Sequence, residues 1–583
     1  MSEFDSFTGA LRRQVAEKPG HVAVRFHSGG GAEFLTYAEL DLAARRVAAW
    51  AREATGPGER VLLSCAPGTA FLQAFLGCLY AGRVPVPVPP PDGQGRQTHR
   101  TAGIARDTGA RLLLTDTAAM LSGDGLEALT VVPVGEALKS DPAGWTPPLP
   151  EPGSLAFLQY TSGSTSEPKG VMVHHGALAH NLSLMRDSHG WHGGMTWCSW
   201  LPAYHDMGLI AMMLAPLYLG GTAVLMPATD FLKRPASWLR LIDSCGADVS
   251  CAPNFAYELC ARLGDEQIAG LDLSRWRFAC NGAEPVDART LARFADRFRP
   301  AGLRRSALLP GYGLAEATLY VSGTPAHEEP AVFRVDPVAL EQGRLAEGGT
   351  DAVEVAASGV VRGLDVRIVD PVRRTETEPG VIGEVWIRGG SVAQGYWGRP
   401  EETARTFGGR TAGGDGGFLR TGDLGAFHDG ALVVTGRLKE IIIVHGRNLY
   451  PHDIEREVSA LDPAFDGLPA TVFAVRAPGR GHEEIVVTQE VRGRGVPAGD
   501  LEALARRTRT ALARRLGVAV AGLVLLRVGR TRRTTSGKIQ RNRMRELFLR
   551  GELEAWHEEL DPALHGGAAR PLRVSSATAG ARS

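Results

Sequence analysis

Short apolar runs alternate with helix candidates up to about residue 320, and this alternation constrains the fold more than any other feature. Residues 111–115 and 130–133 are predicted to be buried parallel strands, and residues 37–54 are predicted to form a helix. Strands that alternate with helices are typical of layered α/β domains. We therefore expect α/β architecture, built from layered α/β subdomains, in the larger part of the chain.

The pattern changes beyond residue 320. Residues 325–358 are predicted to be mostly loop with weak helix. An antiparallel β section is predicted next, with strands at 363–370, 383–389 and 417–427. A compact α+β pattern follows, with helices at 453–461 and 501–516 and strands at 471–476, 484–491 and 523–528.

These patterns predict the domain organisation. We expect a large N-terminal domain over residues 1–436 and a small C-terminal α+β domain over residues 437–560. Residues 561–583 are rich in Ala, Gly, Ser and Arg, which predicts a disordered tail.

The composition is that of a soluble globular protein. Of the 583 residues, 44% are hydrophobic and 22% are charged, and the formal net charge is zero. A chain without net charge has no global attraction to nucleic acid or to an anionic membrane. The seven cysteines are scattered, odd in number and without a Cys-x-x-Cys pair, which is typical of reduced thiols in the cytoplasm.

Neither a signal peptide nor a transmembrane segment is expected. The first five residues are acidic and lack an apolar stretch. Residues 208–226 carry no charge, but Pro216 and Gly220-Gly221 interrupt them, which favours a helix, a turn and a core strand. The expected location is therefore cytoplasmic.

A loop rich in hydroxyls and glycine, ending in a lysine, separates two predicted strands at residues 155–160 and 171–173. Small side chains, backbone N–H groups and one cation are what a polyphosphate needs. The order Pro168-Lys169-Gly170 differs from a Walker A loop, which ends in Gly-Lys-Ser/Thr. By itself such a loop is better explained as a polar hairpin turn, so the phosphate interpretation depends on the rest of the chain.

Further motifs follow in a definite order. They are Ser199-Trp-Leu-Pro-Ala-Tyr-His-Asp-Met-Gly-Leu-Ile210, Asn281-Gly-Ala-Glu-Pro-Val286, Gly311-Tyr-Gly-Leu-Ala-Glu-Ala-Thr-Leu319, Thr421-Gly-Asp-Leu-Gly425, Gly436-Arg-Leu-Lys-Glu-Ile441 and Thr535-Ser-Gly-Lys-Ile-Gln-Arg541. Each alone has an ordinary explanation, such as a turn or a surface charge. Together, from about residue 10 to residue 550, they closely resemble the adenylate-forming superfamily of acyl-CoA synthetases, nonribosomal peptide adenylation domains and luciferases.

Within that superfamily the chain is most similar to the fatty acyl-AMP ligases. Its loop has Ser166-Glu167 where many relatives carry a second glycine, and residues 201–209 and 312–318 look like that subfamily's versions. Residues 324–355 resemble the insertion that marks these ligases and is associated with poor use of coenzyme A. The alternative for this stretch is an ordinary variable surface loop.

The resemblance implies a two-step reaction. A fatty acid would react with ATP to give acyl-AMP and pyrophosphate. The acyl group would then pass to the phosphopantetheine thiol of an acyl carrier protein, acting in trans, for polyketide or nonribosomal peptide biosynthesis. The small domain would be mobile and rotate between the two steps.

The resemblance also implies a nucleotide site, where cations and N–H donors must gather because a carboxylate attacks a phosphate. The implied ATP ligands are Thr161, Ser162, Gly163, Ser164, Thr165, Lys169, Asn281, Gly282, Ala283, Glu284, Gly311, Tyr312, Gly313, Leu314, Asp423 and Arg437. Tyr312 would stack on adenine, and Asp423 would accept hydrogen bonds from the ribose hydroxyls. Glu316 and Thr161 are the implied Mg²⁺ ligands, since this hard ion takes oxygen donors.

The remaining implied residues serve catalysis and acyl binding. Lys538 would neutralise charge at the α-phosphate, Lys439 matches the hinge position, and His205 would lie near the substrate carboxylate. The residues expected to wall an acyl tunnel are Met207, Ile210, Phe255 and Tyr257. Ordinary core packing explains each of these four equally well.

Two other functions remain open at this point. The first is a fatty acyl-CoA synthetase, which would use coenzyme A instead of a carrier protein. The second is a catalytically inactive regulator that binds acyl groups or nucleotides. Intact Lys169, Glu316, Asp423 and Lys538 argue against the second.

Two further features have non-catalytic explanations. The arginine-rich residues 527–545 lack an aromatic stacking pattern, so we expect a solvated face or a docking surface for an acidic carrier protein rather than a nucleic-acid site. His174, His175, His189 and His192 lack the accompanying ligand spacing of a metal site, so we expect them to be structural.

Overall fold

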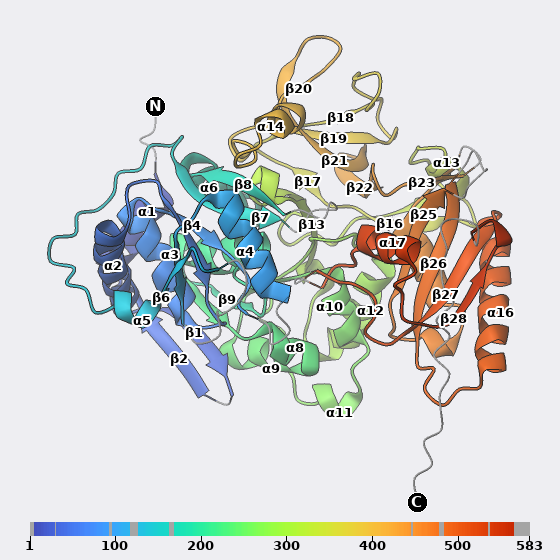
Figure 1. Ribbon diagram of the computed structural model, residues 1–583, viewed down its shortest axis with the longest axis horizontal. Helices are drawn as coiled ribbons and strands as arrows, with labels where there is room; N and C mark the ends of the chain where they lie inside the picture. The colour runs from blue at the N-terminus through green and yellow to red at the C-terminus, as the bar shows by residue number, and fades with distance from the viewer. Residues whose placement is uncertain are drawn as a thin grey trace, which may run out of the picture. The chain divides into compact units, whose positions relative to one another are not determined.

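The computed structural model describes residues 5–29, 31–91, 96–116, 126–161, 168–444, 447–476, 483–534 and 537–564. These residues form two compact units (Figure 1). The first holds the described residues up to Asp336 together with Glu347–Val434. The second holds Pro337–Ala346 together with the described residues from Thr435 onward, so part of the stretch that resembles the ligase insertion belongs to the second unit.

The largest sheet of the first unit has nine strands in the order β17-β14-β13-β12-β11-β9-β10-β1-β2. Their bounds are β1 (Val22–Ser28), β2 (Gly31–Thr36), β9 (Thr196–Ser199), β10 (Thr222–Leu225), β11 (Val249–Ala252), β12 (Phe278–Asn281), β13 (Leu308–Gly313), β14 (Tyr320–Gly323) and β17 (Val360–Val361). From β1 to β13 every neighbouring pair is parallel, and the pairs at both edges are antiparallel. Such a sheet needs helices between its strands.

Helices and a second parallel sheet complete this α/β part. The second sheet has the order β4-β3-β5-β6, so the predicted parallel strands at 111–115 and 130–133 are confirmed. Its strands are β3 (Arg60–Ser64), β4 (Val84–Pro87), β5 (Leu112–Thr115) and β6 (Thr130–Pro133). The helices are α1 (Phe7–Glu17), α2 (Tyr37–Ala54), α3 (Thr69–Ala81), α4 (Arg96–Thr108), α5 (Val134–Ala137), α6 (His175–His189), α7 (Ala215–Leu219), α8 (Ala228–Lys233), α9 (Ala236–Cys245), α10 (Asn254–Ala261), α11 (Asp265–Ile268) and α12 (Ala288–Phe298).

The rest of the first unit is a hairpin and the predicted antiparallel β section. The hairpin consists of β7 (Leu155–Thr161) and β8 (Lys169–His174). The β section contains β18 (Asp365–Val369), β19 (Gly383–Arg388), β20 (Gly409–Arg410), β21 (Gly416–His428) and β22 (Ala431–Arg437), with α14 (Pro400–Phe407) beside β21. The three strands predicted for this section are confirmed.

The second unit is α+β, as predicted. Its four-stranded sheet has the order β25 (Ala470–Arg476), β26 (Glu483–Val491), β27 (Val520–Arg527), β28 (Ala555–Leu560). The other elements are α13 (Pro337–Glu341), β23 (Ile442–Val444), β24 (Arg447–Leu449), α15 (Pro451–Ser459), α16 (Ala498–Leu516) and α17 (Arg541–Arg550). Arg447 donates two hydrogen bonds, of 2.7 and 2.6 Å, to the Glu341 carboxylate of α13. Pro562–Leu564 form a short 3-10 helix, and residues 565–583 of the predicted tail lie outside the described residues.

The prediction of loop and weak helix for residues 325–358 is wrong in part. Val332–Val335 (β15) and Val353–Ala356 (β16) form an antiparallel pair. Each strand has only four residues, and its partner lies about 20 positions away, so neither has a local signal strong enough to identify it. In the arginine-rich residues 527–545, Arg541 is not on a solvated face, because it pairs with Glu440 (2.8 Å) and Glu455 (2.7 Å).

The uncharged stretch 208–226 folds as predicted into helix, turn and strand. It comprises the π-helix η2 (Met207–Leu214), then α7 and β10. Among the helices that the structure describes, none combines the length and the apolar character needed to cross a bilayer.

Gly77 tests the packing of α3 on α2. A Cβ atom at Gly77 would lie 2.4 Å from the side chain of Val47 on α2. We expect Gly77→Ala to lower the free energy of unfolding by about 1–3 kcal/mol, because the helices must move apart. Gly103→Ala on α4 is the matched control: a Cβ atom there meets nothing within 4 Å, so a gain of ~0.5–1 kcal/mol is expected. Equal unfolding midpoints in urea for the two variants would contradict this packing.

Candidate active site

The carboxyl ends of the neighbouring parallel strands β9, β11, β12 and β13 meet at one edge of the large sheet. In the register, Ala252 lies beside Asn281, and Asn281 lies beside Pro310. Three sequence motifs begin at this edge, at Ser199, Asn281 and Gly311. Ligands of parallel α/β sheets bind outside the carboxyl ends of the strands. The fold therefore brings these three motifs together where a ligand is expected.

Gly282 and Gly311 form the closest approach between two of these loops. A Cβ atom at Gly282 would lie 2.9 Å from the carbonyl oxygen of Gly311, so only glycine allows this spacing. Ala283 follows with a φ of +67°, a left-handed conformation that is strained for alanine. The next residue after Gly311 is Tyr312, whose ring is the predicted stacking face for adenine.

Gly313 and Leu314 begin the turn that carries Glu316. A Cβ atom at Gly313 would lie 1.9 Å from the carbonyl oxygen of Leu319, and the Leu314 N–H donates to that same oxygen at 2.9 Å. Glu316 lies on the 3-10 helix η5 (Ala315–Ala317), which packs beside β8 of the hairpin. The turn thus places a carboxylate next to the strand that follows the predicted phosphate loop.

Asp423 is oriented by the predicted adenine-stacking residue. Its side chain is buried, and Oδ2 accepts a hydrogen bond of 2.7 Å from the Tyr312 hydroxyl. Its backbone N–H donates to Thr421 Oγ1 at 3.0 Å. A carboxylate fixed in this way next to a stacking ring suits the predicted contact with ribose.

Asn281 and Glu284 hold the loop after β12 in place. Asn281 Nδ2 donates to Asn254 Oδ1 (3.1 Å), and Glu284 Oε1 accepts from the Phe255 N–H (2.6 Å). Asn281 Oδ1 is buried and has no hydrogen-bond partner among the described residues. That oxygen is available to a donor of a ligand, and the role of both residues as nucleotide ligands stays a prediction.

Thr161 and Lys169 lie opposite each other at the open end of the β7–β8 hairpin. The predicted phosphate ligands Ser162, Gly163, Ser164 and Thr165 lie outside the described residues. Lys169 forms an ion pair with Glu402 on α14, and its Nζ lies 5.1 Å from the centre of the Tyr396 ring. The Tyr396 hydroxyl donates to Glu316 Oε1 at 2.7 Å, so one tyrosine contacts both the predicted phosphate-binding lysine and the predicted metal ligand.

Tyr396 and Glu402 are not among the residues that the sequence predicts for the site. They belong to Gly395-Tyr-Trp-Gly-Arg-Pro-Glu-Glu402, more than 200 residues after the loop. The local signal is a proline followed by two acidic residues in the first turn of α14, which is an ordinary helix start. Only the tertiary contacts indicate a role at the site.

The oxygen donors suit Mg²⁺. Glu316 offers a carboxylate and Thr161 a hydroxyl, and protein sites commonly bind Mg²⁺ through one or two carboxylates together with substrate phosphates. Within the described part of the chain, no group of three or more His, Cys, Asp or Glu side chains is placed to hold a metal. These two donors fit an ion that the phosphates of a nucleotide also hold.

The predicted acyl residues lie around η2 and α10. His205 precedes η2, with Nδ1 2.8 Å from Asp206 Oδ1, and Met207 and Ile210 lie buried on η2. A π-helix is rare and is frequently found at functional sites. Phe255 is half-buried, with its ring 6.0 Å from Trp200.

Tyr257 lies deeper than the other predicted acyl residues. It is fully buried, and its hydroxyl donates to the carbonyl oxygen of Cys280 at 2.8 Å. Its ring packs edge-on against Phe294 at 5.0 Å. These contacts are those of the core-packing alternative, and burial raises its pKa far above the usual range.

Lys439, Lys538 and Arg437 lie in the second unit. Lys439 is exposed in the turn after β22, and Arg437 ends that strand. Lys538 is half-buried; its N–H donates to Thr534 Oγ1 (3.0 Å), and its carbonyl accepts from the Thr534 N–H (2.7 Å). The backbone of the predicted catalytic lysine is thus held by a tight turn.

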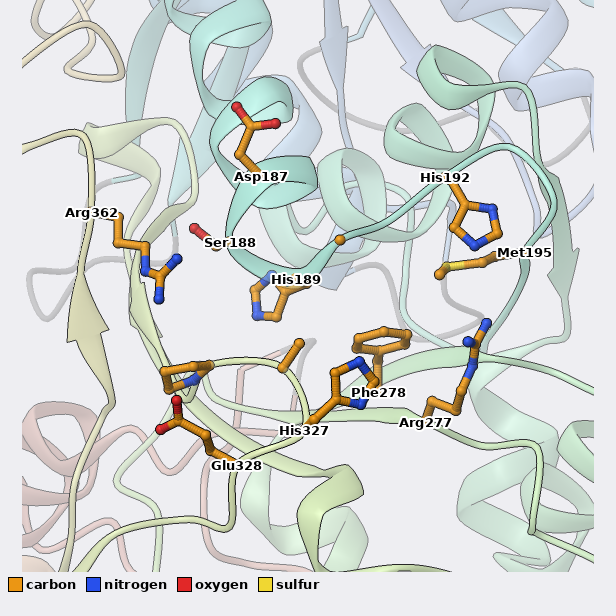
Figure 2. Close-up of a pocket in the computed structure, with 13 residues that line it drawn as sticks. Asp187, Ser188, His189, His192, Met195, Arg277, Phe278, His327, Glu328 and Arg362 are labelled. Carbon is orange, nitrogen blue, oxygen red and sulfur yellow. The ribbon is translucent and has the colours of Figure 1, made fainter.

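A cavity of about 350 Å³ lies at the opposite, amino end of β12, next to the end of α6 (Figure 2). Its lining includes His189, Phe278, His327 and Arg362, and none of the predicted site residues lines it. His189 stacks on Trp191 at 5.0 Å, and burial lowers its pKa to about 4. No sequence motif indicates this cavity, because its lining comes from separate elements of the chain.

Comparison with known proteins identifies the family. The model of the AMP-binding enzyme family matches residues 11–397. The medium-chain fatty acid–acyl-carrier-protein ligase JamA of Moorena producens is 37% identical, covering 97% of this chain and 99% of that protein. The long-chain fatty acid–AMP ligase FadD26 of Mycobacterium marinum is 36% identical, covering 92% and 96%.

Solved structures agree with this assignment. A fatty acyl-adenylate ligase from Legionella pneumophila, in complex with acyl adenylate and pyrophosphate, is 34% identical with a TM-score of 0.74, covering 96% of this chain and 98% of that chain. A structure from a study of fatty acyl-adenylate ligases from E. coli and L. pneumophila reaches a TM-score of 0.84 at 30% identity, covering 94% and 98%. The chain therefore belongs to the AMP-binding enzyme family and, within it, to the fatty acyl-AMP ligases.

Proposed function

We propose that this enzyme activates a fatty acid with ATP, releases pyrophosphate, and transfers the acyl group from acyl-AMP to the phosphopantetheine thiol of an acyl carrier protein supplied in trans. The observation that carries this proposal is the similarity to a fatty acid–acyl-carrier-protein ligase across 97% of the chain, which spans both units. The residues on which the chemistry depends, Lys169, Glu316, Asp423 and Lys538, are all present. A cytoplasmic location fits the free cysteines.

The proposed roles follow from charge. The attacking carboxylate and the α-phosphate repel each other, so preorganised cations lower the barrier. Lys169 would contact the departing phosphates and Lys538 the α-phosphate. Asp423, held by Tyr312, would accept from the ribose, and Glu316 would bind Mg²⁺, which supplies charge stabilisation when bound.

Product analysis with competing acceptors tests this function. With a panel of fatty acids, ATP and Mg²⁺, we expect pyrophosphate release and acyl-AMP, then acyl transfer to holo-carrier protein in preference to coenzyme A. Mass spectrometry of both products measures the preference. Efficient acyl-CoA formation would favour the acyl-CoA synthetase, and no pyrophosphate with any fatty acid would favour an inactive binding protein.

Lys538 tests the catalytic role of the second unit. We expect Lys538→Ala to slow acyl-AMP formation by ~10²–10³, because a preorganised donor is lost from the transition state. ATP and fatty acid binding should persist. Lys139→Ala, at an exposed lysine that pairs with Glu136, is the control and should retain full activity. Unchanged acyl-AMP yield in Lys538→Ala would remove this role.

Lys439 tests the hinge. We expect Lys439→Pro to leave acyl-AMP formation intact and to slow acyl transfer, because proline fixes φ near −65° at a position that must rotate. Lys439→Ala keeps the backbone free and should support both steps. Single-turnover measurement of each step separates them, and loss of both steps in Lys439→Pro would contradict a hinge.

A further inference from the structure

A short segment, Ala393–Trp397, contacts both the β7–β8 hairpin and the turn that carries Glu316. Tyr396 forms an antiparallel bridge with Val171 on β8. The Met172 N–H donates to the Gly395 carbonyl at 2.9 Å, and the Ala393 N–H donates to the Glu316 carbonyl at 2.9 Å. The backbone of this segment is therefore fixed against both β8 of the hairpin and the η5 turn that carries Glu316.

The Tyr396 side chain lies between two functional charges. It is only 6% exposed, and its hydroxyl donates to Glu316 Oε1 at 2.7 Å. Its ring face meets the Lys169 ammonium, with Nζ 5.1 Å from the ring centre, and its edge packs against Phe407 at 5.3 Å.

Glu402 completes the group. It pairs with Lys169, and both side chains are mostly buried, at 25% and 19% exposed. A polyphosphate that reaches Lys169 must compete with this carboxylate for the same ammonium. The Tyr396 hydroxyl, in contrast, orients Glu316 without neutralising it, because a neutral donor leaves the carboxylate its charge.

We propose that Tyr396 and Glu402 act as positioning residues for the nucleotide site, with Tyr396 aiming the Glu316 carboxylate at Mg²⁺ and Glu402 holding Lys169 in place until phosphate displaces it. This inference rests on the proposed function, because it assumes that Mg²⁺ and ATP bind here. It assigns opposite effects to the two residues: Tyr396 promotes binding of the metal complex, and Glu402 opposes binding of phosphate.

Calorimetric titration of the full-length chain tests the proposal without turnover. ATP is titrated with excess Mg²⁺ and, separately, with EDTA. In Tyr396→Phe we expect affinity for Mg²⁺·ATP to fall roughly tenfold, because a hydrogen bond to a charged group is lost, while affinity for ATP in EDTA stays unchanged. In Glu402→Gln we expect affinity to rise about two- to fivefold in both conditions, because a competing charge is removed.

Tyr80→Phe is the matched control. Tyr80 is also buried and donates to a carboxylate, Asp41 Oδ1, at 3.0 Å, but it lies on α3 outside the site. This variant should lose stability in thermal unfolding and keep wild-type affinity in both titrations. If Tyr396 had a purely structural role, Tyr396→Phe would behave like Tyr80→Phe: it would lose stability and keep wild-type affinity in both titrations.

The outcomes separate the two proposals. Absence of Mg²⁺·ATP binding in the wild-type chain would overturn the proposed function. If the wild-type chain binds Mg²⁺·ATP and Tyr396→Phe binds it with the same affinity, the positioning role of Tyr396 is overturned and the proposed function stands. Weaker ATP binding in Glu402→Gln would show that Glu402 assists the phosphate instead of competing with it, and would overturn its assigned role.

Discussion

The parallel register of the large sheet is the constraint on which the candidate site depends. Because β9, β11, β12 and β13 are parallel neighbours, the loops after them all emerge at one edge. Motifs that are separated by up to about 110 residues in sequence therefore meet in space. The close approach of Gly282 to Gly311 is a direct consequence, since adjacent strands bring the two backbones within contact distance.

Two carboxylates at the site, the buried Asp423 and the half-buried Glu316, are oriented by neutral donors. Asp423 accepts from Tyr312 and Glu316 accepts from Tyr396, each at 2.7 Å. A buried carboxylate is costly without hydrogen bonds, and a neutral hydroxyl supplies one while leaving the negative charge available to a ligand. Tyr312 thus supplies the hydrogen bond that the buried Asp423 needs, and both tyrosines leave their carboxylate its charge.

The second unit has its own anchor close to the predicted hinge. Arg541 on α17 pairs with Glu440, which follows Lys439, and with Glu455 on α15. The guanidinium thus fixes the chain directly after Lys439 to the body of the second unit. Rotation about Lys439 would then move Glu440 together with α15 and α17, because Arg541 binds all three to one another.

The sequence by itself determined the α/β class, the antiparallel β section and the α+β second unit, because apolar periodicity is a local property. It also predicted site roles for Lys169, Glu316, Asp423 and Lys538, since each lies in a short contiguous motif. Only the tertiary structure decided that Tyr257 lies in the core, that β15 pairs with β16, and that Tyr396 and Glu402 join Lys169 to Glu316. These facts depend on contacts between residues far apart in the chain, which leave no periodic or local signal.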